Sequence, residues 1–318
     1  MTSCRTSCTN QETVEIPYDW HTPLESGMTL EDPARFLWWE AFDDPLLTGL
    51  IEEAACRNND VRIAAIQSTE KMLETINLVA AEIARNYIEL RGLQMRLKVF
   101  QTDIEAQKKV FTLGEGLSNI GFINSIDQDE NKKNLYFLEV QKSLIELSIN
   151  KTIFHLSTLL SYPPGGLYEI LHQPQELPEL PSCIPVGTPC ELVQQHPAVR
   201  EAKKNYEMTR DKQSFYNYQK KILDVFEETE NALAAFHSEL DKIYYLDNIK
   251  TLKADAYQLT LDLYKQGLKD DRDIHKAHQE FLSAENTLIQ SKTQLLINYV
   301  NLYQALGGGW EADCSSEV

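Results

Sequence analysis

The sequence lacks any apolar run long enough to cross a bilayer as a helix. Its 318 residues contain no stretch of 18 or more consecutive apolar residues, the length that a transmembrane helix needs. The opening residues, MTSCRTSCTNQETVE, also contain no apolar stretch that could form the centre of a signal peptide. From the sequence alone we therefore expect neither a membrane-spanning helix nor an export signal in this chain.

Basic residues are scarce relative to acidic ones. Lys plus Arg number 30 against 48 for Asp plus Glu, which gives a formal net charge of −18. A surface of that sign repels the phosphates of nucleic acids. We therefore expect no nucleic-acid partner.

Motifs for metal binding and catalysis are also missing. The six cysteines lie far apart with no Cys-x-x-Cys pair, so zinc or iron–sulfur ligation has little support and free thiols are favoured. His275 and His278, with Asp271 one turn earlier, could form a surface metal site, but the spacing supplies no matched third ligand, and we predict none. No Gly-rich phosphate loop, Gly-x-Ser-x-Gly or His-Glu-x-x-His motif occurs. We predict that the chain is not an enzyme and binds no cofactor.

Proline and glycine are absent from long parts of the chain and concentrated in others. Eight of the twelve prolines fall between Pro163 and Pro197, a block that we interpret as an extended connector rather than as helix or central strand. By contrast, neither residue occurs from Ala198 to Gln266 or from Lys269 to Leu306, as expected of long helices. The predicted organisation is an extended tail over 1–36, a first helical repeat over 37–160, a proline-rich connector over 161–197, a second helical repeat over 198–306 and a C-terminal tail over 307–318.

Apolar residues recur every seven positions in both helical segments. Such a repeat keeps one apolar stripe facing a partner helix and predicts left-handed coiled-coil packing. The first stripe would span roughly 50 Å as one helix. The stripes are Ile76, Ile83, Leu90, Leu97, Ile104 and Phe111, with Leu93 and Phe100 beside them, and then Ile274, Phe281, Leu288, Leu295 and Leu302.

The two halves also resemble each other. NNDVRIAAIQ in the first half is similar to HPAVREAKKN in the second, and GLSNIGFI (Gly116 to Ile123) is similar to GLKDDRDI (Gly267 to Ile274). Each Gly-Leu lies between two long helical runs, where glycine can adopt the left-handed conformation that ends a helix. We predict an all-α fold of two internal repeats, each a long antiparallel coiled-coil hairpin with its tip at Gly-Leu.

Two adjacent tryptophans precede the first predicted helix, in the segment ARFLWWEAFDDPLL. Asp44 can cap this helix and Pro45 can occupy its first turn, where no amide donor is needed. We predict that Trp38 and Trp39 are a buried aromatic pair that packs against neighbouring helices, rather than a ligand site. After the cap, steps of three and four residues form an apolar seam with one basic member: Leu46, Leu50, Ala54, Arg57 and Val61.

Four segments together resemble the TolC-like outer-membrane factors of tripartite efflux systems, especially their lipoprotein branch. They are WWEAFDDPLLTGLIEEAACRNNDVRIA, IARNYIELRGLQ, LPSCIPVGTPCELVQQHPAVREA and LYQALGGGWE, and they run in order from about Trp38 to Glu311. The resemblance implies a homotrimer whose helices form a hollow periplasmic tunnel for efflux, located at the cell outer membrane or in the periplasm. It also implies two partners, a periplasmic adaptor (membrane fusion protein) and an inner-membrane efflux pump.

The resemblance further assigns roles to the hairpin tips, where the family docks its adaptor and constricts the channel. Three copies of the second tip would form a ring of carboxylates that favours cations, although Lys269 stands where many relatives have an acidic residue, and solvated tip charges are the alternative. The residues so implicated are Gly116, Leu117, Ser118, Gly267, Leu268, Lys269, Asp270, Asp271 and Asp273. Because the lipoprotein branch often begins its mature chain with an acylated cysteine, Cys4 and Cys8 are lipidation candidates.

The sequence departs from the family pattern at two matching places. Relatives carry a β-hairpin in each half, whereas the segments from Asp60 to Tyr87 and from Val199 to Glu228 contain no alternating run of about ten residues suited to a membrane strand. We therefore expect the membrane β-strands to be absent, through natural loss, trimming of the chain or gene damage. The alternative to an efflux channel is accordingly a soluble barrel-less helical scaffold, or a non-conducting remnant, that retains the adaptor-binding tips.

Overall fold

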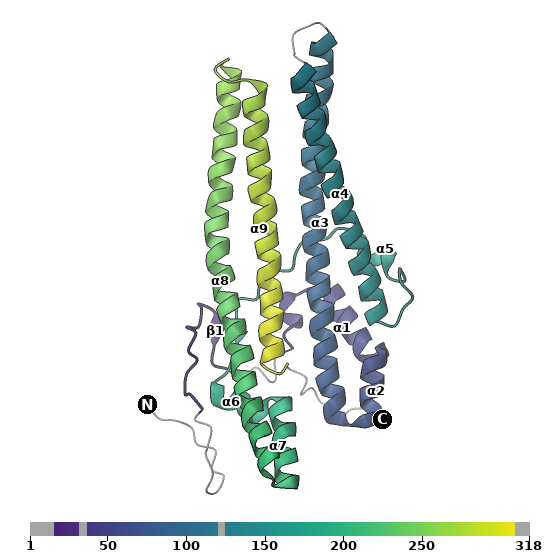
Figure 1. Ribbon diagram of the computed structural model, residues 1–318, viewed down its shortest axis with the longest axis vertical. Coiled ribbons are helices and arrows are strands. Elements are labelled where there is room, and N and C mark those ends of the chain that lie inside the picture. The colour runs from purple at the N-terminus through teal and green to yellow at the C-terminus, as the bar shows by residue number, and fades with distance from the viewer. Residues whose placement is uncertain (1–15, 32–36, 120–124, 309–318) are drawn as a thin grey trace.

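Four long helices dominate the computed structural model, which describes residues 16–31, 37–119 and 125–308 (Figure 1). At 1.5 Å per residue, the two longer helices extend roughly 75–80 Å and the two shorter ones about 50 Å. They are α3 (Thr69–Asn119), α4 (Ser125–Leu159), α8 (Lys212–Lys265) and α9 (Asp271–Ala305). These rods confirm the predicted all-α fold.

The four rods lie side by side in the order α8, α9, α3, α4 (Figure 1). Helices α3 and α4 form one antiparallel hairpin, α8 and α9 form the other, and α9 packs against α3 where the two hairpins meet. Helices α4 and α8 are therefore the two edges of a single layer. None of the helices in the described part of the chain is both long and apolar enough to cross a membrane.

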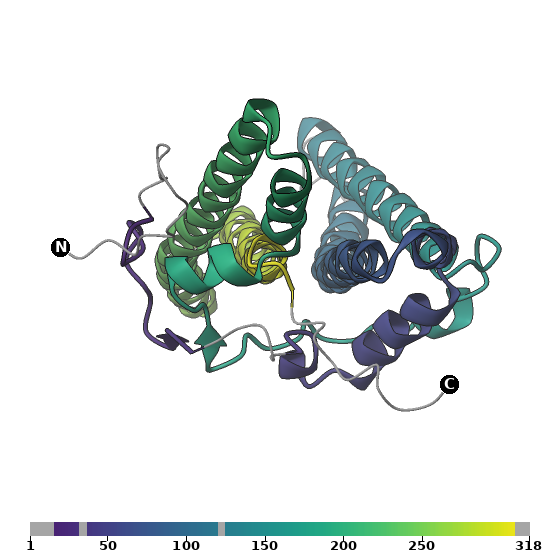
Figure 2. The same cartoon turned by 90° about the horizontal axis from the view of Figure 1, so that it is seen from below.

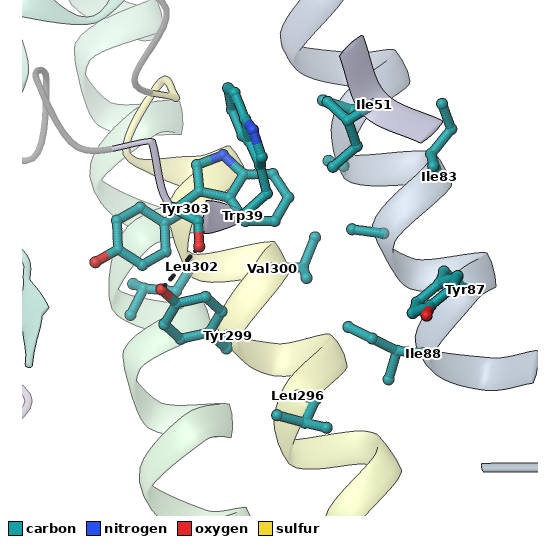
Figure 3. Packing of buried hydrophobic residues seen from close by; sticks show 14 of the residues in the cluster. Trp39, Ile51, Ile83, Tyr87, Ile88, Leu296, Tyr299, Val300, Leu302 and Tyr303 are labelled. Carbon is teal, nitrogen blue, oxygen red and sulfur yellow. Dashed lines mark hydrogen bonds between the residues drawn. The ribbon is translucent and has the colours of Figure 1, made fainter. Parts of the chain in front are cut away.

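The predicted heptad stripes face into the contacts between the rods. Ile83 and Leu90 of α3 and Leu302 of α9 are fully buried, and Val300 and Leu296 of α9 face Ile88 of α3 (Figure 3). Burial decreases toward the tips: Phe111, Ile274 and Phe281 are half-buried, although Ile104 is still buried. The coiled-coil prediction is confirmed, with the best packing in the half away from the tips.

Short helices at the end opposite the tips repeat the same arrangement in both halves. In the first half α1 (Pro45–Arg57) and α2 (Asn59–Gln67) precede α3, and in the second α6 (Pro189–Gln195) and α7 (Pro197–Thr209) precede α8. Only Ser68 separates α2 from α3, and only Arg210 and Asp211 separate α7 from α8. The predicted internal repeat is therefore present at the level of whole helices.

The start of α1 follows the prediction closely. Asp44 accepts hydrogen bonds from the backbone N–H groups of Leu46 (3.0 Å) and Leu47 (3.1 Å), and Pro45 is the first helical residue. Trp38 and Trp39 are both buried, and Trp38 stacks on Tyr303 of α9 at 6.3 Å between ring centroids; Figure 3 shows Trp39 beside the same helix. The tryptophan pair thus fixes the chain entering α1 to the end of α9.

The apolar seam that follows Asp44 is interrupted at Arg57. Asn58 ends α1 and caps α2, accepting hydrogen bonds from the N–H groups of Asp60 and Val61. This break turns Arg57 outward, where its guanidinium pairs with Glu53 and lies over the Tyr162 ring. The buried members of the seam are Leu50, Ala54 and Val61.

The proline-rich connector is extended only in part. It contains a single helical turn, α5 (Tyr168–Leu171), the strand β2 (Ile184–Pro185) and the helix α6. Helix α6 forms despite Pro189 because proline is tolerated at the first helical position, and a capping box between Thr188 and Glu191 stabilises that end. The expectation that this block forms no regular helix was wrong for this reason.

The N-terminal segment and the connector cross one face of the layer (Figure 2). The strand β1 (Met28–Thr29) pairs in parallel with β2. Trp20 donates its indole N–H to the Gly187 carbonyl (2.9 Å). Glu230 of α8 accepts from the Thr22 N–H and hydroxyl groups. The first described residues are therefore held against the second hairpin.

Candidate functional site

The tip of the second hairpin is a glycine-ended helix terminus. Gly267 has φ +75°, in the left-handed region. Its N–H donates to the Tyr264 carbonyl (2.8 Å), and the Leu268 N–H donates to the Leu263 carbonyl (3.0 Å). This pair of bonds is the Schellman motif, which satisfies the last carbonyls of a helix. The prediction that glycine ends the helix is confirmed at this tip.

Most charges of the second tip are already engaged within the chain. The Lys269 ammonium lies 3.1 Å from an Asp273 carboxylate oxygen, and this hydrogen-bonded cation lowers the pKa of Asp273. Asp270 caps α9 by accepting a hydrogen bond from the Asp273 N–H (3.0 Å). Leu268, in contrast, is 68% exposed. The tip therefore presents an apolar side chain beside acidic residues whose charge is partly neutralised by Lys269. The side chain of Asp271 is not among those that the structure describes.

The first tip is built differently. Helix α3 continues to Asn119, so Gly116, Leu117 and Ser118 lie within its last turn. Glycine inside a helix costs only about 1 kcal/mol relative to alanine, which neighbouring helical residues can offset. The expectation that Gly116 itself ends the helix was wrong, and the connection to α4 falls in residues 120–124, outside the described residues.

Among the described side chains, the remaining candidate ligands do not gather into a metal site. His278 lies 5.0 Å from the Tyr257 ring, between centroids, on the contact between α8 and α9. Across the residues that the structure describes, no three His, Cys, Asp or Glu side chains gather closely enough to hold a metal ion. Cys56 and Cys183 are free thiols. The lipidation candidates Cys4 and Cys8 lie outside the described residues.

Both edges of the layer carry exposed apolar stripes that the sequence analysis missed. Each stripe follows the three- and four-residue steps of a coiled-coil seam, yet its side chains are 41–67% exposed in the single chain. On α4 the stripe is Phe137, Val140, Leu144, Leu147 and Phe154, and on α8 it is Tyr245, Ile249, Leu252 and Leu259. The sequence does contain these residues as a second seven-residue repeat in each helix. That repeat can be recognised only once the faces of α4 and α8 that pack inside the chain are known.

The contact between the two hairpins is close-packed around a single glycine. A Cβ placed on Gly92 of α3 would lie 2.3 Å from the Thr293 hydroxyl oxygen of α9. Arg96 donates to the Asn286 side chain (2.9 Å), and Arg85 donates to Asn301 (3.2 Å) on the opposite side of this contact. Burial lowers the pKa of both arginines. Polar pairs therefore align α3 and α9 on either side of Gly92.

Sequence comparison relates the second half of the chain to a known family. Residues 192–308 match the family of outer membrane efflux proteins. The cation efflux system protein CusC of Escherichia coli O6:H1 is 30% identical over 102 residues, 32% of this chain and 22% of CusC. The probable efflux pump outer membrane protein TtgC of Pseudomonas putida is 31% identical over 93 residues, 29% of this chain and 19% of TtgC. These matches span about a fifth of the length of the curated relatives.

Solved structures extend the likeness to nearly the whole fold. The outer-membrane channel OprN superposes with a TM-score of 0.80 at 18% identity, covering 96% of this chain and all of that structure. The outer membrane channel CmeC of Campylobacter jejuni superposes with a TM-score of 0.78 at 13% identity, covering 97% and 95% of the two chains. At these identities the likeness establishes the fold. Sequence and fold together relate the chain to the TolC-like efflux factors, as its motifs predicted.

Proposed function

We propose that this chain, related in sequence and fold to outer membrane efflux proteins, forms the periplasmic helical tunnel of a tripartite efflux system. Three copies would assemble side by side into a hollow cylinder at the outer membrane. The tunnel would conduct small molecules delivered by an inner-membrane pump through a periplasmic adaptor. The chain itself would be a passive conduit without catalytic chemistry.

The observation that carries this proposal is the pair of unpartnered edges. A layer of four rods ordered α8, α9, α3, α4 ends on both sides in an apolar heptad stripe. Because α4 and α8 are opposite edges, pairing α4 of one copy with α8 of the next repeats head to tail, the kind of contact that forms a ring when the rotation between copies closes. A coiled-coil seam would then run between copies as it does within each hairpin.

The hairpin tips would dock the adaptor and gate the tunnel. The second tip offers the exposed Leu268 on a rigid Schellman turn, flanked by the Lys269–Asp273 pair. We propose that adaptor contacts at this tip, and at Gly116 to Ser118 of the first, move the hairpin ends relative to each other. The sparser burial toward the tips supports motion there, because few buried apolar contacts resist it.

The assembly test is the mass of the purified chain by light scattering. The wild-type chain is expected to be a trimer, and Leu252→Glu a monomer, because a carboxylate would enter the seam between α8 and α4. Ile170→Glu changes another exposed apolar residue (54%, against 67% for Leu252) on α5 and should remain a trimer. A wild-type monomer at micromolar concentration would contradict the proposal.

The docking test uses the helical hairpin of a candidate adaptor in a calorimetric titration. Leu268→Glu should weaken binding at least tenfold, whereas Ile170→Glu should not change it. Equal binding by wild type and Leu268→Glu would remove the second tip from the docking site.

A further inference from the structure

Positive charge is concentrated at the end of the molecule opposite the tips. Residues 57–71 and 200–221 together contain ten Lys and Arg against five Asp and Glu. These two segments carry a formal charge of +5 in a chain whose net charge is −18, or +3 when Glu53 and Glu74, the ion-pair partners of Arg57 and Lys71, are included. They include α2, α7 and the starts of α3 and α8, which Figure 1 places together at one end of the rods.

The same segments expose large apolar side chains. Ile66 at the end of α2 is 86% exposed and Met208 near the end of α7 is 74% exposed. Ile63 and Tyr216 in the same two segments are 54% and 57% exposed. Unlike the edge stripes, these residues belong to α2, α7 and the start of α8, elements at the end of the molecule opposite the tips (Figure 1).

The two segments meet at one cavity. Lys71 of α3 and Lys204 and Met208 of α7 line the same cavity of about 280 Å³. Lys71 pairs with Glu74 at 2.7 Å. Its hydrogen bond to Glu74 raises the pKa of Lys71, and the negative charge of Glu201 on α7 raises it further. Basic side chains of both repeats, and Met208 of the second, therefore meet at this cavity.

We propose that this basic end binds an anionic phospholipid surface. Protruding apolar side chains ringed by Lys and Arg are the combination that holds a protein at a membrane interface: the apolar groups enter the boundary between headgroups and acyl chains, and the cations attract lipid phosphates. This inference needs only the single chain and does not rest on assembly or conduction.

The charge component is tested by sedimentation with vesicles. The wild-type chain should bind vesicles of phosphatidylcholine with 30% phosphatidylglycerol, bind pure phosphatidylcholine at least tenfold more weakly, and lose binding as salt is raised. Lys203→Glu with Lys204→Glu should reduce binding to the anionic vesicles at least tenfold. Lys132→Glu with Lys133→Glu, an adjacent exposed pair near the opposite end of the molecule, should leave it unchanged.

The apolar component is tested on the same vesicles. Ile66→Ser with Met208→Ser should weaken binding at least fivefold, while Ile170→Ser should not. Equal binding to neutral and anionic vesicles, or an equal loss in the Lys132 and Lys133 variant, would overturn the proposal. If Lys203→Glu with Lys204→Glu weakens binding but Ile66→Ser with Met208→Ser does not, the proposed insertion of these two apolar side chains is overturned. Trimer mass and tip docking are measured without lipid, so a failure here leaves the proposed function standing.

Discussion

Replacing Gly92 by alanine should loosen the contact between the two hairpins. The new Cβ would lie 2.3 Å from the Thr293 hydroxyl oxygen, 2.8 Å from its methyl carbon and 3.1 Å from its Cβ. Thr293 is buried, and its hydroxyl donates to the Ile289 carbonyl at 2.8 Å, so its side chain cannot turn aside without losing that bond. The helices must separate, at an overpacking cost of up to about 3 kcal/mol. Alanine favours the helix over glycine by about 1 kcal/mol, so the free energy of unfolding should fall by about 2 kcal/mol in total.

The assay is urea unfolding at fixed chain concentration, followed by circular dichroism. Gly49→Ala is the matched control, because Gly49 lies inside α1 and a Cβ there would meet nothing within 4 Å. This control should be stabilised by about 0.5–1 kcal/mol. Adding Thr293→Ala to Gly92→Ala should recover at least 1 kcal/mol as coupling between the two sites. If Gly92→Ala is stabilised as much as Gly49→Ala, the helices do not approach each other as described.

Changes at three further positions test one helix cap and two buried titratable groups. Asp44→Ala should cost about 1–2 kcal/mol in urea unfolding, since it removes the cap of α1 and the acceptor for the Tyr87 hydroxyl (2.6 Å), whereas Asp44→Asn should cost clearly less. Burial, assisted by Lys221, lowers the pKa of His196 to about 4; the unfolded chain therefore binds the extra proton first, and up to about 3 kcal/mol of stability should be lost as the pH falls from 6.5 to 4. His196→Asn retains an acceptor for the Ala198 N–H and should remove that part of the pH dependence; an unchanged profile would exclude His196 as its source. Burial raises the pKa of Asp103, partly offset by His278. Asp103→Asn should therefore raise the melting temperature at pH 7.5, by an amount that vanishes as Asp103 becomes protonated at low pH.

Features with a local cause were predictable from the sequence. The cap at Asp44 and Pro45 and the left-handed Gly267 each depend on a few neighbouring residues, and each is present as predicted. The seven-residue apolar repeats predicted the long helices correctly, because a repeat of that period is typical of coiled-coil packing. The buried tryptophan pair was expected, but its partner Tyr303, far along the chain, was not.

Features set by competition or by distant contacts were not predictable. Gly116 could either end α3 or be accommodated within it, and the structure shows that α3 continues through Gly116 to Asn119. Pro189 begins α6 because the capping box at Thr188 and Glu191 favours that turn over an extended chain. Gly92 packs against Thr293, about 200 positions further along the chain. No local sequence pattern predicts that contact. The edge stripes appear only when the faces of α4 and α8 used within the chain are known.

The central claim is that α4 of one copy packs beside α8 of the next. Phe137 lies 12 residues from the start of α4 and Leu252 lies 13 residues from the end of α8, so both stand about 20 Å from the tip end of their helices. The measurement is disulfide formation between two populations of the chain with native cysteines changed to serine, one carrying Phe137→Cys and the other Leu252→Cys. The account predicts a mixed disulfide-linked dimer in high yield when the populations are combined. No mixed dimer, or a yield no greater than that of Ile170→Cys with Leu252→Cys, would contradict it.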